Sequence, residues 1–326
     1  MTSKNNILIY LKDNDGEWVS GELLSGRLRI SRAAISKQVR KLKEDGYRIE
    51  TSTRKGYRLE ERRDLLLPQE IQEGLGARIF GKKQLVCLKE TDSTNMQAKI
   101  LAAAHAPEGT LVTAEAQTLG RGRKQRDWFA PAGDGIYASL ILRPVIAPDQ
   151  ASCITLTTAV SVAEALISIT GLAVQIKWPN DILIHGKKAV GILTEISTEM
   201  DSIDYVIVGL GINVNTAKDT FPAELRDKAT SIFIETGRRF SRTEILRACL
   251  EHFERDYRLL QETGFDAILN RWKALSNLIG KHIAIQTIKN KYTGHVTDID
   301  SDGALLLKDS QGTIHRIVSG DLSTGQ

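Results

Sequence analysis

The sequence predicts an α+β fold that is divided among several domains. Its 326 residues exceed the roughly 100–200 residues of one typical domain. Strand-like and helical segments are interspersed over residues 84–213, which favours a mixed sheet with helices packed on it. Helices and a hairpin fill the first 60 residues, and short alternating segments between turns fill residues 281–319. We therefore expect three domains, at residues 1–63, 64–277 and 278–326.

Basic side chains are concentrated at the N-terminus. Residues 1–60 contain 13 Lys and Arg against 8 Asp and Glu, a net charge of +5 in a chain whose total is +4. The remaining residues therefore carry a net charge of −1. A short basic domain on a nearly neutral body indicates a polyanionic partner for that domain alone.

Three helices are predicted in this basic domain. Residues 4–12 form the first, and Ser20 begins the second. Ser31 is placed as the N-cap of a third helix that ends near Gly46, and in this helix Ile35, Val39 and Leu42 share one apolar face. The opposite face is polar and mainly basic, with Arg32, Ser36, Lys37, Gln38, Arg40 and Lys41.

A hairpin with a basic tip follows the third helix. Apolar and charged residues alternate over 47–50 and 57–59, and the intervening turn contains Arg54 and Lys55. Helices followed by a basic hairpin predict a winged helix-turn-helix, in which the third helix enters the DNA major groove. We expect Arg32, Ser36, Lys37, Arg40 and the two tip residues to lie nearest DNA. A solvated basic helix is the simpler alternative.

Cysteine usage and hydropathy point to the cytoplasm. Cys87, Cys153 and Cys249 have no paired spacing, so neither a disulfide framework nor a zinc cluster is expected. The N-terminus has no apolar run behind a basic segment, and no stretch is expected to approach the roughly 20 apolar residues of a membrane span. We expect a cytoplasmic protein that makes no membrane contact.

Three segments of the central domain suggest ligand chemistry. In "GRGRKQRDW" (120–128), glycines allow close approach and Arg121, Arg123 and Arg126 offer forked donors for phosphate or carboxylate. A basic surface loop and an RNA contact are the alternatives for this segment. In "KWPND" (177–181), Pro179 ends a strand and leaves oxygen ligands on Asn180 and Asp181, unless the segment is only a structural turn. "GLGIN" (209–213) permits close backbone approach but lacks the third glycine of a dinucleotide fingerprint.

Taken together and in order, these segments resemble the biotin protein ligases. The resemblance rests on "DSTN" (92–95), "AEAQTLGRGR" (114–123), "KWPNDILIHGKKAVGILTE" (177–195), "GLGINVN" (209–215) and the late "SGDLS". It covers essentially the whole chain, and the preceding winged helix resembles the members that are also biotin operon repressors. Gln125 departs from the glycine that many members have in this loop. The resemblance implies a biotin/lipoyl-ligase-like catalytic domain and an SH3-like C-terminal β-barrel.

The resemblance also implies roles for particular residues. Ser93, Thr94 and Gln117 correspond to the residues that bind the ureido group of biotin, with the backbone at Gly209 and Gly211 against its rings. Asn95 is a further expected biotin-binding residue. Lys188 resembles the catalytic lysine, next to Lys187, and acts with Arg121 and Arg123. All three of these catalytic residues are also expected to contact biotin. The residues that resemble contacts of ATP or the adenylate are Arg123, Arg126, Trp128, Asn180, Asp181, Lys188 and Asn213.

Substrates and partners follow from the same resemblance. Biotin and ATP with Mg²⁺ are expected as substrates, with the metal near Asn180 and Asp181, no metal site in the protein alone and no tightly bound prosthetic group. The product biotinyl-5′-AMP is expected to biotinylate a lysine of a biotin carboxyl carrier protein. When this intermediate accumulates, a homodimer is expected to bind operator DNA. Three alternatives stay open: a lipoate-type ligase, a ligand-sensing repressor without ligase activity, and a ligase that no longer binds DNA.

Overall fold

The chain divides into two compact units, which are described separately. The computed structural model describes residues 3–14, 16–61, 64–199, 202–288 and 290–323. The first unit ends at Leu65 and the second begins at Leu66. The catalytic and C-terminal segments therefore lie in one unit, and the three sequence-based domain boundaries stay predictions.

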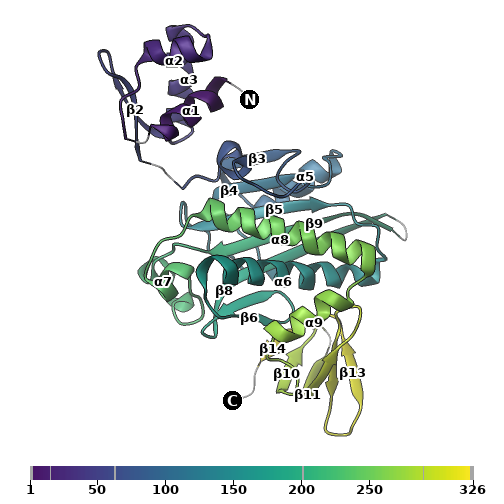
Figure 1. Cartoon of the computed structure of the whole chain (residues 1–326). Coiled ribbons are helices and arrows are strands. Elements are labelled where there is room, and N and C mark those ends of the chain that lie inside the picture. The colour runs from purple at the N-terminus through teal and green to yellow at the C-terminus, as the bar shows by residue number, and fades with distance from the viewer. Residues whose placement is uncertain (1–2, 15, 62–63, 200–201, 289, 324–326) are drawn as a thin grey trace. The chain divides into compact units, whose positions relative to one another are not determined.

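The first unit has the predicted three helices and hairpin (Figure 1). Ser20 and Ser31 accept hydrogen bonds from Leu23 N and Ala34 N, so both predicted N-caps are confirmed. Ile35, Val39 and Leu42 are buried as their spacing predicts. The elements are α1 (Ser3–Asp13), α2 (Gly21–Leu28), α3 (Arg32–Glu44), β1 (Arg48–Ser52) and β2 (Gly56–Glu61).

A seven-stranded mixed sheet forms the centre of the second unit. Its order is β3-β4-β5-β9-β8-β7-β6, and every pairing is antiparallel except that of β3 with β4. The α+β prediction is thereby confirmed. The strands are β3 (Leu85–Thr91), β4 (Leu111–Gln117), β5 (Gly135–Leu142), β6 (Val174–Lys177), β7 (Asp181–Ile184), β8 (Lys187–Glu199) and β9 (Ser202–Asn213).

The two faces of this sheet have different partners. On β5 and β9, Ala138, Leu140, Val208 and Leu210 belong to the main core with the long helices. The intervening residues face the other side, where Ile141 and Ile207 pack under α5. Figure 1 shows α6 and α8 running across the sheet. The helices are α4 (Pro68–Gln72), α5 (Thr94–Ala103), α6 (Ala151–Thr170), α7 (Ile232–Thr236), α8 (Arg242–Thr263) and α9 (Asp266–Leu275).

Helix α6 corrects one expectation about membranes. Its 20 residues are long and apolar enough to cross a bilayer by length and composition, so the expectation that no stretch approaches this length is wrong. In the fold, 67% of the apolar window is buried. The helix is apolar on most of its circumference because it lies between the sheet and the helices α8 and α9.

The C-terminal segment forms a five-stranded antiparallel sheet. Its order is β13-β12-β11-β10-β14. The predicted turn at Asp302 and Gly303 joins β11 to β12, and Gly303 has a φ of 80°. Closure into an SH3-like barrel stays a prediction. The strands are β10 (His282–Gln286), β11 (Lys291–Ile299), β12 (Leu305–Lys308), β13 (Ile314–Ile317) and β14 (Asp321–Ser323).

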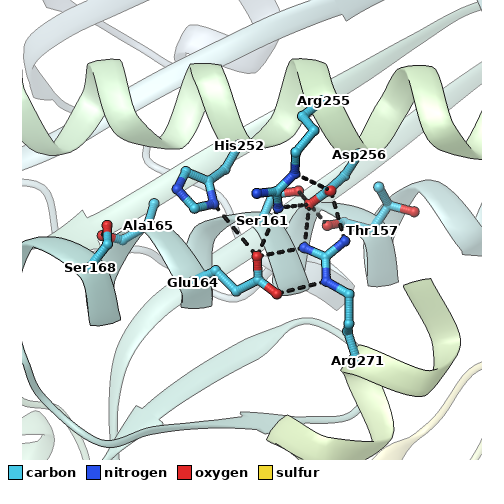
Figure 2. Close-up of polar contacts among 9 residues, drawn as sticks. All are labelled: Thr157, Ser161, Glu164, Ala165, Ser168, His252, Arg255, Asp256 and Arg271. Atoms are coloured by element: carbon cyan, nitrogen blue, oxygen red, sulfur yellow. Dashed lines mark hydrogen bonds and ion pairs between the residues drawn. The ribbon is translucent and has the colours of Figure 1, made fainter. Parts of the chain in front are cut away.

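An ionic cluster ties α6, α8 and α9 together (Figure 2). The carboxylate of Asp256 is fully buried and accepts hydrogen bonds from Arg255, Arg271 and the hydroxyl of Ser161. Both guanidinium groups also donate to Glu164. Burial alone would raise the pKa of Asp256, but its hydrogen bonds outweigh that effect and hold the pKa below its ordinary value.

Replacing Asp256 tests this cluster. Asp256→Asn keeps the volume but leaves two guanidinium groups with less negative charge, and we expect a loss of about 3 kcal/mol in the free energy of unfolding. Because the folded pKa is lowered, the stabilisation by Asp256 is present near neutral pH and is lost as the pH falls through that pKa. Urea unfolding from pH 7 down to about pH 2 should therefore show a smaller acid-induced loss in the variant, with the difference developing below the ordinary carboxyl pKa of 3.8.

A matched control lies on the same helix. Glu262 pairs with Arg258 at 3.9 Å, and both side chains are mostly exposed. Glu262→Gln should change the free energy of unfolding by less than about 0.5 kcal/mol. Equal effects of the two substitutions would contradict a special role for the buried carboxylate.

Candidate functional site

A cavity opens on the sheet face that α5 partly covers. Its volume is about 250 Å³, and its lining comes from β4, β8, β9, the 120–129 loop and the C-terminal sheet. The predicted ligand residues that line it are Ser93, Thr94, Asn95, Gln117, Arg121, Arg123, Arg126, Trp128, Asn180, Asp181, Lys188, Gly209, Gly211 and Asn213. The fold therefore brings together predicted ligand residues that are up to 120 residues apart in sequence, from Ser93 to Asn213.

One end of the cavity is a cradle of short polar side chains. Gln117, the last residue of β4, accepts hydrogen bonds through Oε1 from the backbone N and the Oγ1 of Thr94, at 2.8 and 3.1 Å. Ser93 occupies the N-cap position of α5, but its hydroxyl does not cap the helix. The hydroxyl of Ser93 and the amide nitrogen of Gln117 therefore remain able to contact a ligand.

Asn95 and Ser139 stabilise this cradle from beneath. Ser139 is fully buried on β5, and its Oγ lies 2.6 Å from Asn95 Oδ1 and 2.8 Å from Thr94 Oγ1. The amide nitrogen of Asn95 donates to Leu193 O and to the carboxylate of Glu195. The polar atoms of Asn95 thus have partners within the protein, and because Asn95 also lines the cavity its contact with biotin stays a prediction. Ser139 was not predicted, because a lone serine in an apolar strand carries no sequence signal.

Glycines form the floor of the cavity. Gly191 on β8 and Gly211 on β9 are directly paired across the sheet, and the indole of Trp128 lies on both. A Cβ at Gly211 would come within 2.4 Å of this ring, and a Cβ at Gly209 within 2.2 Å of Asn95 Oδ1. Any residue other than glycine at these two positions would force the Trp128 ring or the Asn95 side chain to move. A ligand ring placed against Gly211 would displace the indole.

Lys188 lies close to Gly191, above the indole of Trp128. Its Nζ is 2.7 Å from Asp181 Oδ1, an ion pair without hydrogen-bond geometry, and 5.3 Å from the centre of the Trp128 ring. The backbone of Lys188 is held by Lys228 O and Thr230 N. Lys187 is not among the lining residues, so the geometry distinguishes the two neighbouring lysines.

Arg123 connects the basic loop to two other segments. Its guanidinium donates to Asn180 Oδ1 at 3.2 Å, to Ser319 Oγ at 2.9 Å and to Gly320 O at 3.4 Å. Burial lowers the pKa of Arg123, while the charges of Asp321 and Asp181 oppose that shift. The amide nitrogen of Asn180 donates to Ile192 O, which fixes the orientation of its side chain.

Asp321 is a second counterion that the sequence did not reveal. It pairs with Lys124 at 3.1 Å and with Arg126. Burial alone would raise its pKa, but Lys124 and the nearby arginines lower it. The basic loop is therefore held against the edge of the C-terminal sheet. The relevant signal was the late "SGDLS" segment, whose aspartate gives no indication of its distant partners.

At Gln125, where the sequence departs from glycine, the loop has a left-handed backbone conformation. Lys124 and Gln125 have φ angles of 55° and 59°, in the left-handed region where glycine is favoured. A glycine at residue 125 would adopt this conformation without strain. Arg121, in the same loop, is exposed, and its backbone pairs with that of Asp127.

The remaining wall includes Asn213, which was predicted, and Phe221, which was not. Asn213 ends β9, and its amide nitrogen donates to Thr230 O at 3.0 Å. Phe221 follows in the next segment and packs against Phe129 with 6.0 Å between ring centres. This aromatic pair offers a flat apolar surface beside the cations.

The first unit presents its basic residues to solvent. Arg32, Ser36, Lys37 and Arg40 are exposed on α3, as the helical spacing predicts. In the hairpin, Arg54 and Lys55 are exposed as well, and the ammonium of Lys55 lies 5.6 Å from the Trp18 ring centre. These groups can reach phosphates without rearrangement of the core.

Comparisons with known proteins agree with this geometry. Residues 87–213 match the model of the Biotin/lipoate A/B protein ligase family. Residues 3–58 match an HTH domain, and residues 278–325 match the Biotin protein ligase C terminal domain.

Full-length relatives and solved structures are also similar. The chain is 40% identical to the Bifunctional ligase/repressor BirA of Bacillus spizizenii over 99% of both chains. It is 31% identical to the Escherichia coli protein of that name, over 97% of this chain and 95% of the relative. A biotin protein ligase from Aquifex aeolicus in complex with biotin and ATP has a TM-score of 0.64 and 32% identity, covering 74% of this chain and 98% of that one. The chain therefore belongs to the biotin protein ligase family, in its bifunctional ligase/repressor group.

Proposed function

We propose that this protein is an ATP-dependent biotin protein ligase and a biotinyl-AMP-dependent repressor of genes for biotin synthesis or transport. One observation carries the proposal: a single cavity joins a polar cradle at Thr94 and Gln117 to a group of cations at Arg123 and Lys188. A urea needs both donors and acceptors, and two anionic reactants need cations. Biotin has a ureido head and a carboxylate tail, which match the two ends.

In the first step, a carboxylate oxygen of biotin attacks the α-phosphorus of ATP. The bond from that phosphorus to the bridging oxygen breaks, pyrophosphate leaves, and biotinyl-5′-AMP forms. Lys188 is placed to stabilise the negative charge that develops on the α-phosphoryl group, an interaction typically worth about 2.7–4 kcal/mol. To do so, its ammonium exchanges the carboxylate of Asp181 for phosphate oxygens.

The basic loop has a second task in this proposal. The mixed anhydride would hydrolyse in water, so the cavity must be closed while the intermediate waits for its acceptor. Arg121, Arg123 and Arg126 lie on a loop that already borders the cavity. Its ion pairs with Asp321 are partly exposed, and such contacts are readily exchanged for a phosphate.

In the second step, the neutral ε-amine of an acceptor lysine attacks the acyl carbon. The bond from that carbon to the phosphate oxygen breaks, AMP leaves, and the amine loses a proton as the amide forms. The acceptor is a biotin carboxyl carrier protein of a biotin-dependent carboxylase.

Mg²⁺ enters as part of the ATP complex. Among the described residues, no three His, Cys, Asp or Glu side chains gather into a metal site. Asp181 fits a role beside the metal, because Mg²⁺ takes one or two carboxylates together with phosphate oxygens and water. Asn180 fits less well, since both polar atoms of its side chain are engaged. The ion would neutralise phosphate charge.

Repression follows from accumulation of the intermediate. Biotinyl-AMP that finds no acceptor stays in the cavity and favours a homodimer, whose two winged helices bind a palindromic operator. This requires that biotinyl-AMP binds the dimer-forming conformation more tightly than the conformation that stays monomeric. ATP, acceptor and DNA together place the protein in the cytoplasm.

Substrate competition distinguishes a biotin ligase from a lipoate-type ligase and from a repressor without ligase activity. The protein is incubated with ATP, Mg²⁺ and equal amounts of biotin and lipoate, and the retained acyl-adenylate is identified by mass spectrometry. We expect biotinyl-AMP, because the cradle offers partners for a urea. Lipoyl-AMP would identify a lipoate-type ligase, and the absence of any adenylate would favour a sensing repressor without ligase activity.

Lys188→Met should lower the rate of biotinyl-AMP formation by about 10²–10³-fold, because a preorganised contact to the transition state is lost. Single-turnover formation of the adenylate is the measurement. Lys187→Met, which alters the adjacent residue outside the cavity lining, should leave this rate nearly unchanged. A larger effect at Lys187 would reverse the assignment.

Lys37→Ala should weaken binding of the biotinyl-AMP-loaded protein to a mixed-sequence DNA duplex. It should also reduce the slope of log affinity against log salt by about one, since one phosphate contact is removed. Fluorescence anisotropy over a salt series measures both quantities. Lys82→Ala removes an equal charge from the second unit and serves as the control. Identical salt slopes for the two variants would argue against DNA contact by α3.

A further inference from the structure

Trp178 joins the "KWPND" segment to the C-terminal sheet. The side chain is buried, with 2% of its surface exposed, and its indole N–H donates to Gly303 O at 3.3 Å. Gly303 lies in the turn between β11 and β12. Trp178 also precedes Pro179, through a cis peptide bond, and so stands two residues before Asn180.

The turn that Trp178 contacts is rigid in its own right. Asp300 Oδ1 accepts hydrogen bonds from Asp302 N and Ala304 N at 3.0 and 2.9 Å. Arg316 on β13 binds the carboxylates of Asp300 and Asp302. Gly303 is packed closely, because a Cβ there would come within 2.8 Å of Leu156 Cδ1.

Three consecutive carbonyls of this turn accept bonds from the catalytic segment. Cys153 Sγ contacts Ser301 O at 3.6 Å, the hydroxyl of Ser152 donates to Asp302 O, and the indole of Trp178 donates to Gly303 O. Two of these donors lie in the first turn of α6. The C-terminal sheet is therefore fixed by directional bonds as well as by apolar packing.

The same sheet reaches the ligand cavity at its other edge. Ser319 and Gly320 hold Arg123, whose guanidinium also binds Asn180. The contacts form a closed ring, from Trp178 through the C-terminal sheet to Arg123 and then through Asn180 back to Trp178. Moving the turn at Gly303 would therefore move the group that holds Arg123.

We propose that Trp178 is a positioning residue for the nucleotide half of the cavity. It keeps the C-terminal sheet in place so that residues 319 and 320 hold Arg123 where the α-phosphate of ATP lies. The cradle at Thr94 and Gln117 has no part in this ring. The inference rests on the proposed ligase function. Trp178 also borders the cavity, and the inference adds a role that acts through the C-terminal sheet, which Ser152 outside the lining tests separately.

The test is Trp178→Phe, which keeps a ring in the core but leaves Gly303 O without its donor. Biotin-dependent exchange of labelled pyrophosphate into ATP is measured while each substrate is varied. We expect the KM for ATP to rise about tenfold, as fits the loss of one partner of a buried hydrogen bond. The KM for biotin should change less than about twofold, since the ureido cradle keeps its contacts.

Trp272→Phe is the matched control. Trp272 is also fully buried, but its indole nitrogen has no hydrogen-bond partner among the described residues. The control removes the same atoms from the core but breaks no hydrogen bond to the C-terminal sheet. Its two KM values should stay close to those of the unchanged protein.

Ser152→Ala provides an independent test should Trp178→Phe fail to fold. It removes the hydroxyl that binds Asp302 O, at a residue outside the lining of the ligand cavity. The KM for ATP should rise here too. Ser168→Ala, near the far end of α6, should have no effect, because among the described residues Ser168 bonds only to Ala165 O of its own helix.

The outcomes separate the positioning role from the ligase proposal. Exchange that depends on biotin in the unchanged protein, with a selective rise in the KM for ATP in both variants, supports the inference. An unchanged KM for ATP, or equal rises for both substrates, would overturn it and reduce Trp178 to a core residue. Absence of biotin-dependent exchange in the unchanged protein would instead refute the proposed function.

Discussion

The paired glycines of β8 and β9 are the constraint on which the cavity depends. Gly191 and Gly211 face each other in adjacent strands, so two bare stretches of backbone form one flat surface in the sheet. Trp128 lies directly on it, and Lys188 lies over the indole. A methyl group at either glycine would lift the ring, and with it the loop that carries the arginines. The apolar residues on the other face of these strands keep the floor flat against α6 and α8.

Charge balance is the second organising feature. Arg123, Lys124, Arg126 and Lys188 would repel one another in a closed cavity, and Asp181 and Asp321 offset that repulsion. Both carboxylates are partly exposed, so each ion pair contributes only about 0–1 kcal/mol. Weak pairs suit a site that must exchange them for phosphate and carboxylate groups of the ligands. A fully buried counterion such as Asp256 would hold its cations too firmly, which fits the location of Asp256 in the helical layer and away from the cavity.

Local features of the fold followed from the sequence because their causes are local. Ser31 caps α3 and the apolar positions of that helix are buried, since capping and helical period act within a few residues. The end of β6 before Pro179 and the end of β9 at Asn213 were predictable for the same reason. The apolar character of α6 was underestimated, because threonines and serines interrupt its apolar residues in the sequence. In the fold, the hydroxyls of these residues bond to carbonyls of the helix itself.

The parts of the site that sequence could not provide are those set by long-range contacts. Asp321 is nearly 200 residues from Lys124, and Ser139 is 44 residues from Asn95, so no spacing rule links them. Asn95 shows a different limit: its place in "DSTN" predicts a ligand contact, and the fold adds a second role, because its amide supports the cradle. A motif identifies which segment lies at a site, but side-chain direction depends on what packs behind it.

The C-terminal sheet shows why a domain boundary need not be a functional boundary. Its strands pair only with one another, which makes it look separable, yet it belongs to the same compact unit as the catalytic sheet. Its turn at Gly303 is bonded to α6 and Trp178, and its edge at Gly320 is bonded to Arg123. A catalytic segment that ended near residue 277 would lack both sets of contacts. The cation group would then lose the backbone that orients it, so the described lining of the cavity is complete only when the chain reaches residue 322.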